Sequence, residues 1–165
     1  MRVLLTGGAI AAIVASLAAC GGSSSGSAAR AEAQKQADLY QIDQVEQAWH
    51  HAASTHNLDL MMSIWAPNAT FTINGTTYTG KPEIRKFFEG AGPFQAQNHW
   101  VSDTPAYKIR TTVNGEKGTL YFECHYVDVK TQKLAAVVGA DQDVKKIDGK
   151  WLITNSVASS PSLSP

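Results

Sequence analysis

The sequence has few cysteines, the residues that form disulfides and bind metals in small folds. Its 165 residues include only two cysteines, Cys20 and Cys124. It contains no spacing of histidines and cysteines typical of a metal site, no glycine-rich phosphate loop and no nucleophile elbow. These absences argue against hydrolytic and redox chemistry, and we expect neither a metal ion nor a cofactor.

An excess of charge of either sign is also missing. Fourteen Lys and Arg residues balance fourteen Asp and Glu residues. Proteins that bind nucleic acid concentrate positive charge on one surface. The pair Lys145-Lys146 is interpreted as a solvated strand end instead of a basic patch, so no nucleic-acid partner is expected.

The N-terminus has the pattern of an export signal. Arg2 precedes an uncharged stretch, 3–19, rich in Ala, Leu, Val and Ile, and Leu17-Ala18-Ala19-Cys20 resembles a bacterial lipobox. We therefore interpret 1–19 as a lipoprotein signal peptide, with Cys20 as the lipidated residue. The alternative is an ordinary signal peptide, or an uncleaved anchor, in which Cys20 is incidental.

The lipobox interpretation predicts where the protein resides. Gly21 begins the run GGSSSGS, a flexible composition, so we expect 20–36 to form the lipidated Cys and a Gly/Ser tether. The protein would be exported and anchored to the membrane at the cell envelope through Cys20. With Cys20 acylated, Cys124 has no disulfide partner, and its apolar strand neighbours predict an inert buried thiol.

Helical periodicity dominates the first part of the remaining chain. One apolar stripe over 28–56 predicts a long helix, and Asp38 and His51 fall on its exposed side. The residues of the stripe are Ile42, Val45, Trp49, Ala52, Ala53 and His56. His50 flanks the stripe, and adjacent helical residues such as His50 and His51 point about 100° apart, so they cannot chelate one ion.

Two further helices and a hairpin follow. Apolar spacing predicts a helix over 58–65 that Pro67 ends. Asn74-Gly75 predicts a two-residue hairpin between strands 69–73 and 76–79, and Gly80 introduces a third helix. Later strands are expected at 97–101, 107–113, 119–130, 134–146 and 151–157. Helices followed by hairpin-linked strands indicate an α+β fold with an antiparallel meander.

This helix–hairpin–glycine–helix order resembles the nuclear transport factor 2-like superfamily and, within it, the SnoaL-like proteins. The resemblance is carried by the residues IWAPNATF at 64–71, then Gly80, Ile84, Phe87 and Phe88. It implies an α+β cone, in which a curved antiparallel sheet wraps around N-terminal helices and encloses one pocket. It also implies a homodimer through the outer sheet face. The SnoaL-like domain would span 37–158, followed by a disordered tail at 159–165.

The resemblance also implies candidate catalytic residues. His99 lies where SnoaL-like and dehydratase-like members carry a pocket histidine, which could act as a base; the alternative is a structural histidine bonded to the backbone. Asp141 lies where steroid-isomerase-like members place a pocket acid; the alternative is a solvated residue, since Asp143 shares its face. His125 is a weaker candidate, because strand alternation places it opposite the apolar face.

Other positions depart from the enzyme patterns. Dehydratase-like members carry a Tyr-Asp pair where this chain has Ala53-Ser54. Steroid-isomerase-like members place a base near Ile73 and an oxyanion tyrosine near Trp49. Both proton-transfer arrangements are therefore incomplete in this sequence.

Aromatic residues are the remaining candidates for a binding site. A pocket would be lined by Trp49, Trp65, Phe71, Phe88, Trp100 and Phe122, although the same side chains could simply form the core. The main hypothesis is a binding or accessory module for a small apolar ligand. The alternatives are a SnoaL-like lyase or isomerase with His99 as base, acting on a small cyclic or polyketide-like substrate, and a structural dimeric lipoprotein with no ligand.

Overall fold

The computed structural model describes residues 23–159. Three α-helices, two short 3-10 helices and seven strands occur in this order: α1 Ser23–Ser54, α2 Leu58–Ser63, β1 Trp65–Ile73, β2 Thr76–Thr79, α3 Gly80–Gly90, η1 Gly92–Phe94, β3 Trp100–Asp103, η2 Ala106–Lys108, β4 Arg110–Asn114, β5 Lys117–Asp128, β6 Lys133–Ile147 and β7 Lys150–Ser159. The predicted signal peptide and most of the predicted tail lie outside the described residues.

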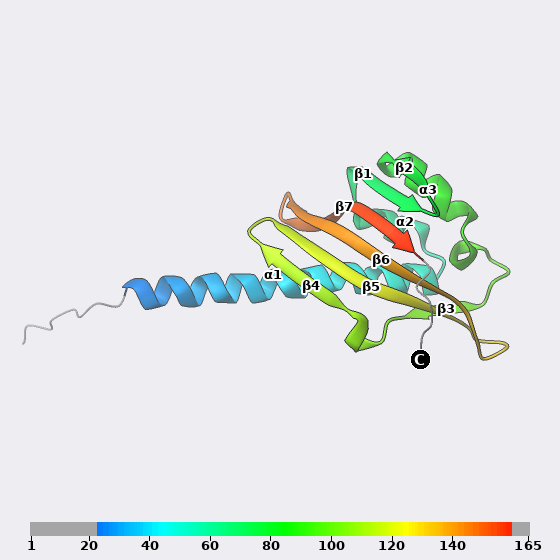
Figure 1. Cartoon of the computed structure of the whole chain (residues 1–165), viewed down its shortest axis with the longest axis horizontal. Coiled ribbons are helices and arrows are strands. Elements are labelled where there is room, and N and C mark those ends of the chain that lie inside the picture. Colours follow the sequence, from blue (N-terminus) through cyan, green and yellow to red (C-terminus); the bar gives the residue numbers. More distant parts are fainter. Residues whose placement is uncertain (1–22, 160–165) are drawn as a thin grey trace, which may run out of the picture.

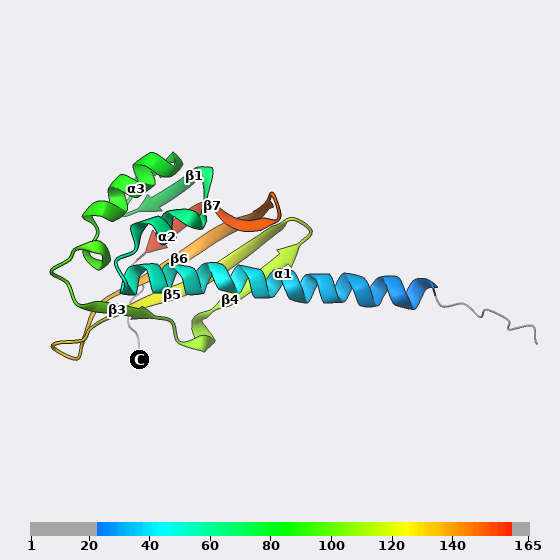
Figure 2. The ribbon, with the colours of Figure 1, turned by 180° about the vertical axis from the view of Figure 1, so that it is seen from behind.

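The fold is a curved sheet with its helices on one face. Figure 1 shows the uncovered face of the sheet in front, with helix α1 running behind it. The opposite view in Figure 2 shows α1 and α2 lying across the concave face, with α3 at the β1 end. The predicted α+β cone is confirmed.

The first hairpin forms as its sequence predicts. Asn74 and Gly75 have φ angles of 50° and 77°, the left-handed values that a two-residue hairpin turn requires. Thr76 then pairs with Ile73, and β2 runs antiparallel to β1. Gly80 has a φ of 79° and lies at the start of α3, so the chain reverses there without strain on a side chain.

The sheet is mixed, which the predicted antiparallel meander did not include. Its order is β2-β1-β7-β6-β5-β3, with β4 also paired to β5. Strands β1 and β7 are parallel, whereas the other pairs are antiparallel. Helix α2 ends at Ser63, earlier than predicted, and Pro67 lies within β1 where the register with β7 shifts.

Helix α1 is longer than predicted. It begins at Ser23, so the segment interpreted as a flexible tether at 20–36 is helical from that residue on. Residues 26–37 are exposed, and Figure 1 shows this part projecting beyond the sheet. Within 23–159, none of the helices has the length and apolar character needed to cross a membrane.

The core lies between α1 and the inner face of the sheet. The predicted apolar stripe of α1 is buried, except that His56 is exposed just beyond the helix end. The alternation predicted for β5 is also confirmed; its inward residues are Leu120, Phe122, Cys124 and Tyr126. Gly118 allows close packing, because a Cβ there would lie 3.0 Å from the Ile42 side chain and 2.4 Å from a backbone oxygen.

Asp38 attaches the helix to the end of the sheet. It was predicted to be exposed, but its carboxylate is buried and accepts hydrogen bonds from Lys146 Nζ at 2.7 Å, Trp151 Nε1 at 3.0 Å and Gln34 Nε2 at 3.1 Å. Lys146 is thus an ion-pair partner and not only a solvated strand end. Hydrogen bonding to Lys146 lowers the pKa of Asp38 against the opposing effect of burial.

Asp38→Asn is expected to lower the free energy of unfolding by about 1–3 kcal/mol at pH 7, because a buried, hydrogen-bonded ion pair is lost. Since the pKa of Asp38 is lower in the folded state, its contribution is complete above about pH 4, the unfolded value, and is lost as pH falls through the folded value. Urea unfolding at pH 7 and pH 3 should show a smaller difference between variant and wild type at pH 3.

The matched control is Asp59→Asn. The Asp59 side chain is 86% exposed in its ion pair with Arg85, so little change is expected at either pH. A loss of stability in Asp38→Asn that is identical at both pH values would contradict the electrostatic role.

Candidate functional site

An apolar cavity lies between the helices and the sheet. It is lined by residues of α1, α3 and η1 and of strands β1, β3, β5, β6 and β7. Its volume is about 230 Å³. Thirteen residues line it: Trp49, Phe71, Ile73, Phe87, Phe88, Ala91, Gly92, Pro93, Trp100, Tyr126, Ala136, Val138 and Ala158. Of these described residues, none carries a carboxyl, imidazole, amine or guanidinium group.

Aromatic contacts fix the cavity walls. The Phe88 ring stacks on Phe71 and meets Trp49 edge-on, with centroids 5.5 Å apart in each pair. Trp100 packs against Tyr126, with 5.9 Å between the ring centroids. A Cβ on Gly92 would lie 2.8 Å from the Trp100 ring, so glycine lets this ring lie against the η1 backbone. The cavity is shaped by rigid rings from separate elements.

Four of the six predicted ligand-binding residues line this cavity: Trp49, Phe71, Phe88 and Trp100. The other two, Trp65 and Phe122, are fully buried and pack behind the wall against Trp49, with centroid distances of 5.8 and 5.5 Å. Both side chains therefore belong to the core. Aromatic composition alone could not separate the side chains that line the cavity from those that lie behind it.

The two predicted catalytic residues do not meet in the cavity. His99 precedes β3 and is absent from the cavity lining, where its neighbour Trp100 lies instead. Its backbone carbonyl accepts a hydrogen bond from the Val129 amide at 3.0 Å. Asp141 is exposed on the outer sheet face, where it lines a separate shallow groove of about 380 Å³ with Arg110 and Tyr121. The alternative of a solvated Asp141 is therefore the one observed.

The residue that points inward on this part of β6 is Gln142, which the sequence analysis missed. Gln142 pairs with Leu120 of β5 and Ser156 of β7, and its side chain is buried. Among the described residues, the Gln142 amide and the Ser156 hydroxyl have no hydrogen-bond partner. Buried polar atoms without partners are costly, and such atoms are a recognised sign of a functional or solvated site.

Further buried polar atoms lie at the junction of α1 and β5, beside the cavity. The buried indole nitrogens of Trp49 and Trp65 have no hydrogen-bond partner among the described residues, and that of Trp49 lies beside the side chains of Cys124 and Tyr126. Burial raises the pKa of the Cys124 thiol to about 12. Burial and the neighbouring Cys124 also raise the pKa of Tyr126 well above its ordinary value. Both groups are therefore protonated near neutral pH, as predicted for an inert Cys124.

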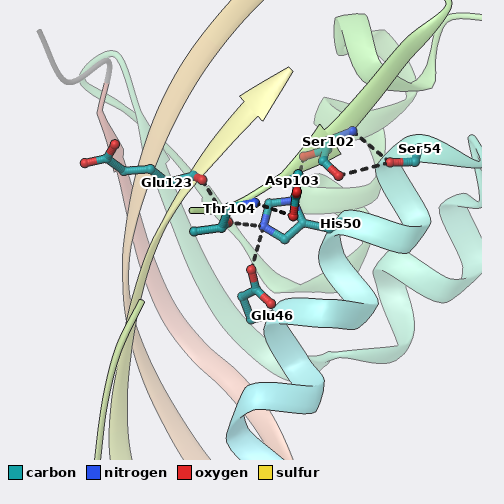
Figure 3. Close-up of polar contacts among 7 residues, drawn as sticks. All are labelled: Glu46, His50, Ser54, Ser102, Asp103, Thr104 and Glu123. Atoms are coloured by element: carbon teal, nitrogen blue, oxygen red, sulfur yellow. Dashed lines mark hydrogen bonds and ion pairs between the residues drawn. The ribbon is translucent and has the colours of Figure 1, made fainter. Parts of the chain in front are cut away.

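Behind this wall, His50 is the centre of a buried polar cluster (Figure 3). Its Nδ1 lies 2.6 Å from Ser102 Oγ, and its Nε2 lies 2.5 Å from Thr104 Oγ1 and 2.9 Å from Glu46 Oε1. Ser54 of α1 adds two bonds to the Ser102 backbone, at 2.8 and 3.4 Å. The cluster joins α1 to β3.

The protons of this cluster can be assigned from its donors and acceptors. Thr104 has one hydroxyl proton, which it donates to the Glu123 carbonyl oxygen at 2.8 Å. A carbonyl can only accept, so the contact between Thr104 and His50 requires an N–H on Nε2 of the imidazole. In neutral His50, Nδ1 then accepts from the Ser102 hydroxyl. All polar atoms of the imidazole are satisfied without a ligand.

The sequence contained one signal for this cluster. Glu46 and His50 are four residues apart, the spacing at which helical side chains meet. Their partners on the β3 segment are more than fifty residues away and could not be identified from local patterns.

Among residues 23–159, no three His, Cys, Asp or Glu side chains are grouped so as to hold a metal ion.

The outer sheet face carries a second charged group, centred on Glu123. Burial would raise the pKa of Glu123, but hydrogen bonds from Lys108, His125 and Tyr121 outweigh it and lower the pKa. His125 Nε2 lies 3.2 Å from the carboxylate, on the outer face where strand alternation placed it. Figure 3 shows the Glu123 side chain pointing away from His50.

His50→Ala is expected to lower the free energy of unfolding by about 2–4 kcal/mol, because it removes three contacts and leaves the Glu46 carboxylate buried with fewer partners. His51→Ala is the matched control: the same substitution one residue later, at an exposed position, should cost less than about 0.5 kcal/mol. Urea unfolding measures both. Equal losses in the two variants would show that the His50 cluster does not stabilise the fold.

Solved structures with this architecture are numerous but distant in sequence. A nuclear transport factor 2-like protein with a cystatin-like fold from Novosphingobium aromaticivorans is 13% identical, with a TM-score of 0.69 over 86% of this chain and 92% of that one. A protein of unknown function from Pseudomonas putida is 13% identical, with a TM-score of 0.68 over 79% and 98%. At these identities, the likeness concerns the fold alone.

One similar structure has a provisional enzymatic assignment. It is a dehydratase-assigned member of the nuclear transport factor 2-like family from Streptomyces avermitilis, 14% identical, with a TM-score of 0.61 over 79% of this chain and 99% of that one. A comparison with proteins of curated function gives no match. The family model described as a SnoaL-like domain matches residues 34–157, most of the chain. With this match and the observed cone, the protein belongs to the SnoaL-like domain family.

Proposed function

We propose that this domain binds a small, mostly apolar, ring-containing molecule in the cavity between α1, α3 and the sheet. The observation that carries the proposal is the cavity itself, an aromatic-walled space whose described lining has no ionised group. Apolar pockets with one or two polar atoms are the usual form of a small-molecule site.

The size of the cavity limits the ligand. An apolar cavity of about 150 Å³ is sufficient for benzene. The 230 Å³ available here therefore fits a single aromatic ring with a short substituent. The rings of Phe71, Phe88 and Trp100 pack against other rings in this wall. A planar aromatic ligand could make edge-on or stacked contacts with them.

The two alternatives have less support. Proton transfer with His99 as base requires an imidazole at the ligand, and His99 does not line the cavity. His50 is buried behind the wall, with its nitrogens already engaged by Glu46, Ser102 and Thr104. A structural lipoprotein with a filled core would not need this apolar cavity. Binding without chemistry is the function that the geometry supports best.

Ala136→Phe is expected to reduce binding of ethylbenzene at least ten-fold, because the new ring occupies the cavity. Isothermal titration calorimetry of the purified protein with ethylbenzene measures this loss. Ala135→Phe is the matched control, with the same substitution at the exposed neighbouring residue, and it should bind as wild type does. Wild-type protein that binds no ethylbenzene, or two variants that bind equally, would overturn the proposal.

We also propose that the domain is carried at the cell envelope by lipid on Cys20. The support is the Leu17-Ala18-Ala19-Cys20 sequence, together with the exposed segment 26–37 of α1 that leads away from the domain. Each buried CH₂ of an acyl chain contributes about 0.8 kcal/mol to membrane association. The helix would then act as a spacer between the membrane surface and the cavity.

Cys20→Ser is expected to abolish the mass increase caused by acylation and to release the protein from the membrane fraction. Intact-protein mass spectrometry and fractionation of the expressing bacteria measure both effects. Cys124→Ala is the control at the other cysteine, which is buried, and it should remain acylated. Membrane retention of Cys20→Ser with an unchanged mass would show that the anchor lies elsewhere.

A further inference from the structure

Two carboxylates line a groove on the other side of helix α1 from the apolar cavity's lining. The helix forms one side of this groove, and the segment from η2 to β4 forms the other, through Ala106, Ile109 and Thr111. The groove has a volume of about 550 Å³, and none of its described lining residues lines the cavity. Asp43 and Glu46 contribute the carboxylates. Because they are three residues apart in a helix, their side chains are neighbours on one face.

Glu46 is unusually buried for a carboxylate that has no basic partner. Its side chain is only 8% exposed, whereas Glu side chains are rarely buried to this extent unless they are paired. Figure 3 shows one carboxylate oxygen directed to His50, where Oε1 lies 2.9 Å from Nε2 of the imidazole. Within residues 23–159, no hydrogen bond or ion pair engages the other oxygen, Oε2. Glu46 therefore presents a nearly buried, incompletely bonded carboxylate to the groove.

Asp43 adds a second oxygen of the same kind. The Thr111 hydroxyl donates to Oδ1 of Asp43 at 3.0 Å, and Oδ2 has no partner in the described part of the chain. The two carboxylates together place two negative charges in the groove. An imidazolium at His50 would balance only one of them.

The described lining of the groove contains no basic side chain. The basic residues of the adjoining segment are Lys108 and Arg110, and both are engaged elsewhere. Lys108 Nζ lies 3.1 Å from the Glu123 carboxylate, and the Arg110 guanidinium lies 3.8 Å from the centroid of the Tyr121 ring. The groove is therefore acidic without an internal counter-charge.

A second buried carboxylate of helix α1 provides a comparison. Asp38 is also buried, but Lys146 of β6 donates to it at 2.7 Å. Glu46 has no such cation among the described residues. Because a buried charge without a counter-charge destabilises a fold, a cation from outside the chain would relieve a cost that the fold itself leaves in place.

An exposed aromatic ring completes the groove. Tyr40 lines it and is 65% exposed. It precedes Asp43 by three residues, so the ring and the carboxylate are neighbours on the helix surface. The face of an aromatic ring attracts cations, and a planar guanidinium can also stack on it.

We propose that this groove binds a guanidinium-bearing organic cation. The planar fork would donate to Oε2 of Glu46 and Oδ2 of Asp43, while its face lies on Tyr40. A guanidinium suits the site better than an ammonium, because it is more weakly hydrated and the ligand has to lose water beside a nearly buried carboxylate. A metal ion has less support, since residues 23–159 contain no group of three ligating side chains. This site is separate from the apolar cavity and does not depend on its function.

Butylguanidinium and butylammonium test the proposal, because they share a chain and a charge and differ in the cationic head. Titrations of the purified protein at low salt, where exposed charges are least screened, are followed in ¹H–¹⁵N spectra. Butylguanidinium should bind about three-fold more tightly than butylammonium or better. Its largest shifts should occur at the backbone amides of Asp43, Glu46 and Thr111.

Glu46→Gln should weaken butylguanidinium binding about five-fold or more, because the charge is lost while the shape is kept. Asp59→Asn is the matched control: it removes one negative charge from α2, outside the groove, and should change the affinity less than about two-fold. Glu46→Gln should also unfold at the same urea concentration as wild type or a higher one, because an unpaired buried charge is removed.

Asp43→Asn repeats the binding test at the less buried carboxylate, so the result does not depend on the folding of Glu46→Gln. The site does not exist if butylguanidinium shifts no amide of the groove in wild type, or if Asp43→Asn and Asp59→Asn bind it equally. Equal affinities for the two cations would show that the groove does not select a guanidinium.

Discussion

The packing of α1 across the concave face of the sheet is the constraint on which the rest of the structure depends. Ile42 packs against the backbone at Gly118, Trp49 contacts Trp65, Phe88 and Phe122, and Asp38 ties the helix to Lys146. These contacts hold the helix along one side of a curved sheet. A space is left between them that residues of α3, η1, β6 and β7 also line. The cavity is a consequence of that packing.

Polar groups in the interior fall into two kinds. The hydrogen-bonding atoms of Asp38 and His50 are engaged by neighbouring side chains. These two residues therefore attach helix α1 to the sheet. Side chains of a second group are as buried but have polar atoms without partners in the described part of the chain: Trp49, Trp65, Gln142 and Ser156. A buried polar atom without a hydrogen bond lowers the stability of the fold, whereas a hydrogen-bonded one does not. The second group is therefore where a functional role is worth testing.

The same cone can hold different chemistries, and what distinguishes them is the residues that face its interior. Here the inward positions of β6 and β7 include Ala136, Val138, Gln142 and Ala158, with no acid or base among them. The acids of β6, Asp141 and Asp143, lie on the outer face in the groove with Arg110. The acids of β6 thus lie outside and the aromatic rings inside, which is the arrangement on which the proposed binding function rests.

Local chemistry in the sequence determined much of the fold: the Asn74-Gly75 turn, the apolar stripe of α1, the alternation along β5 and the family resemblance. These features depend on residues only a few positions apart, within the reach of helical and strand periodicity. Tertiary structure alone decided the parallel pairing of β1 with β7, the register that turns Gln142 inward and Asp141 outward, and the partners of His50 on β3. Each depends on the alignment of segments distant in sequence, and a shift of one residue along a strand would exchange its inner and outer faces.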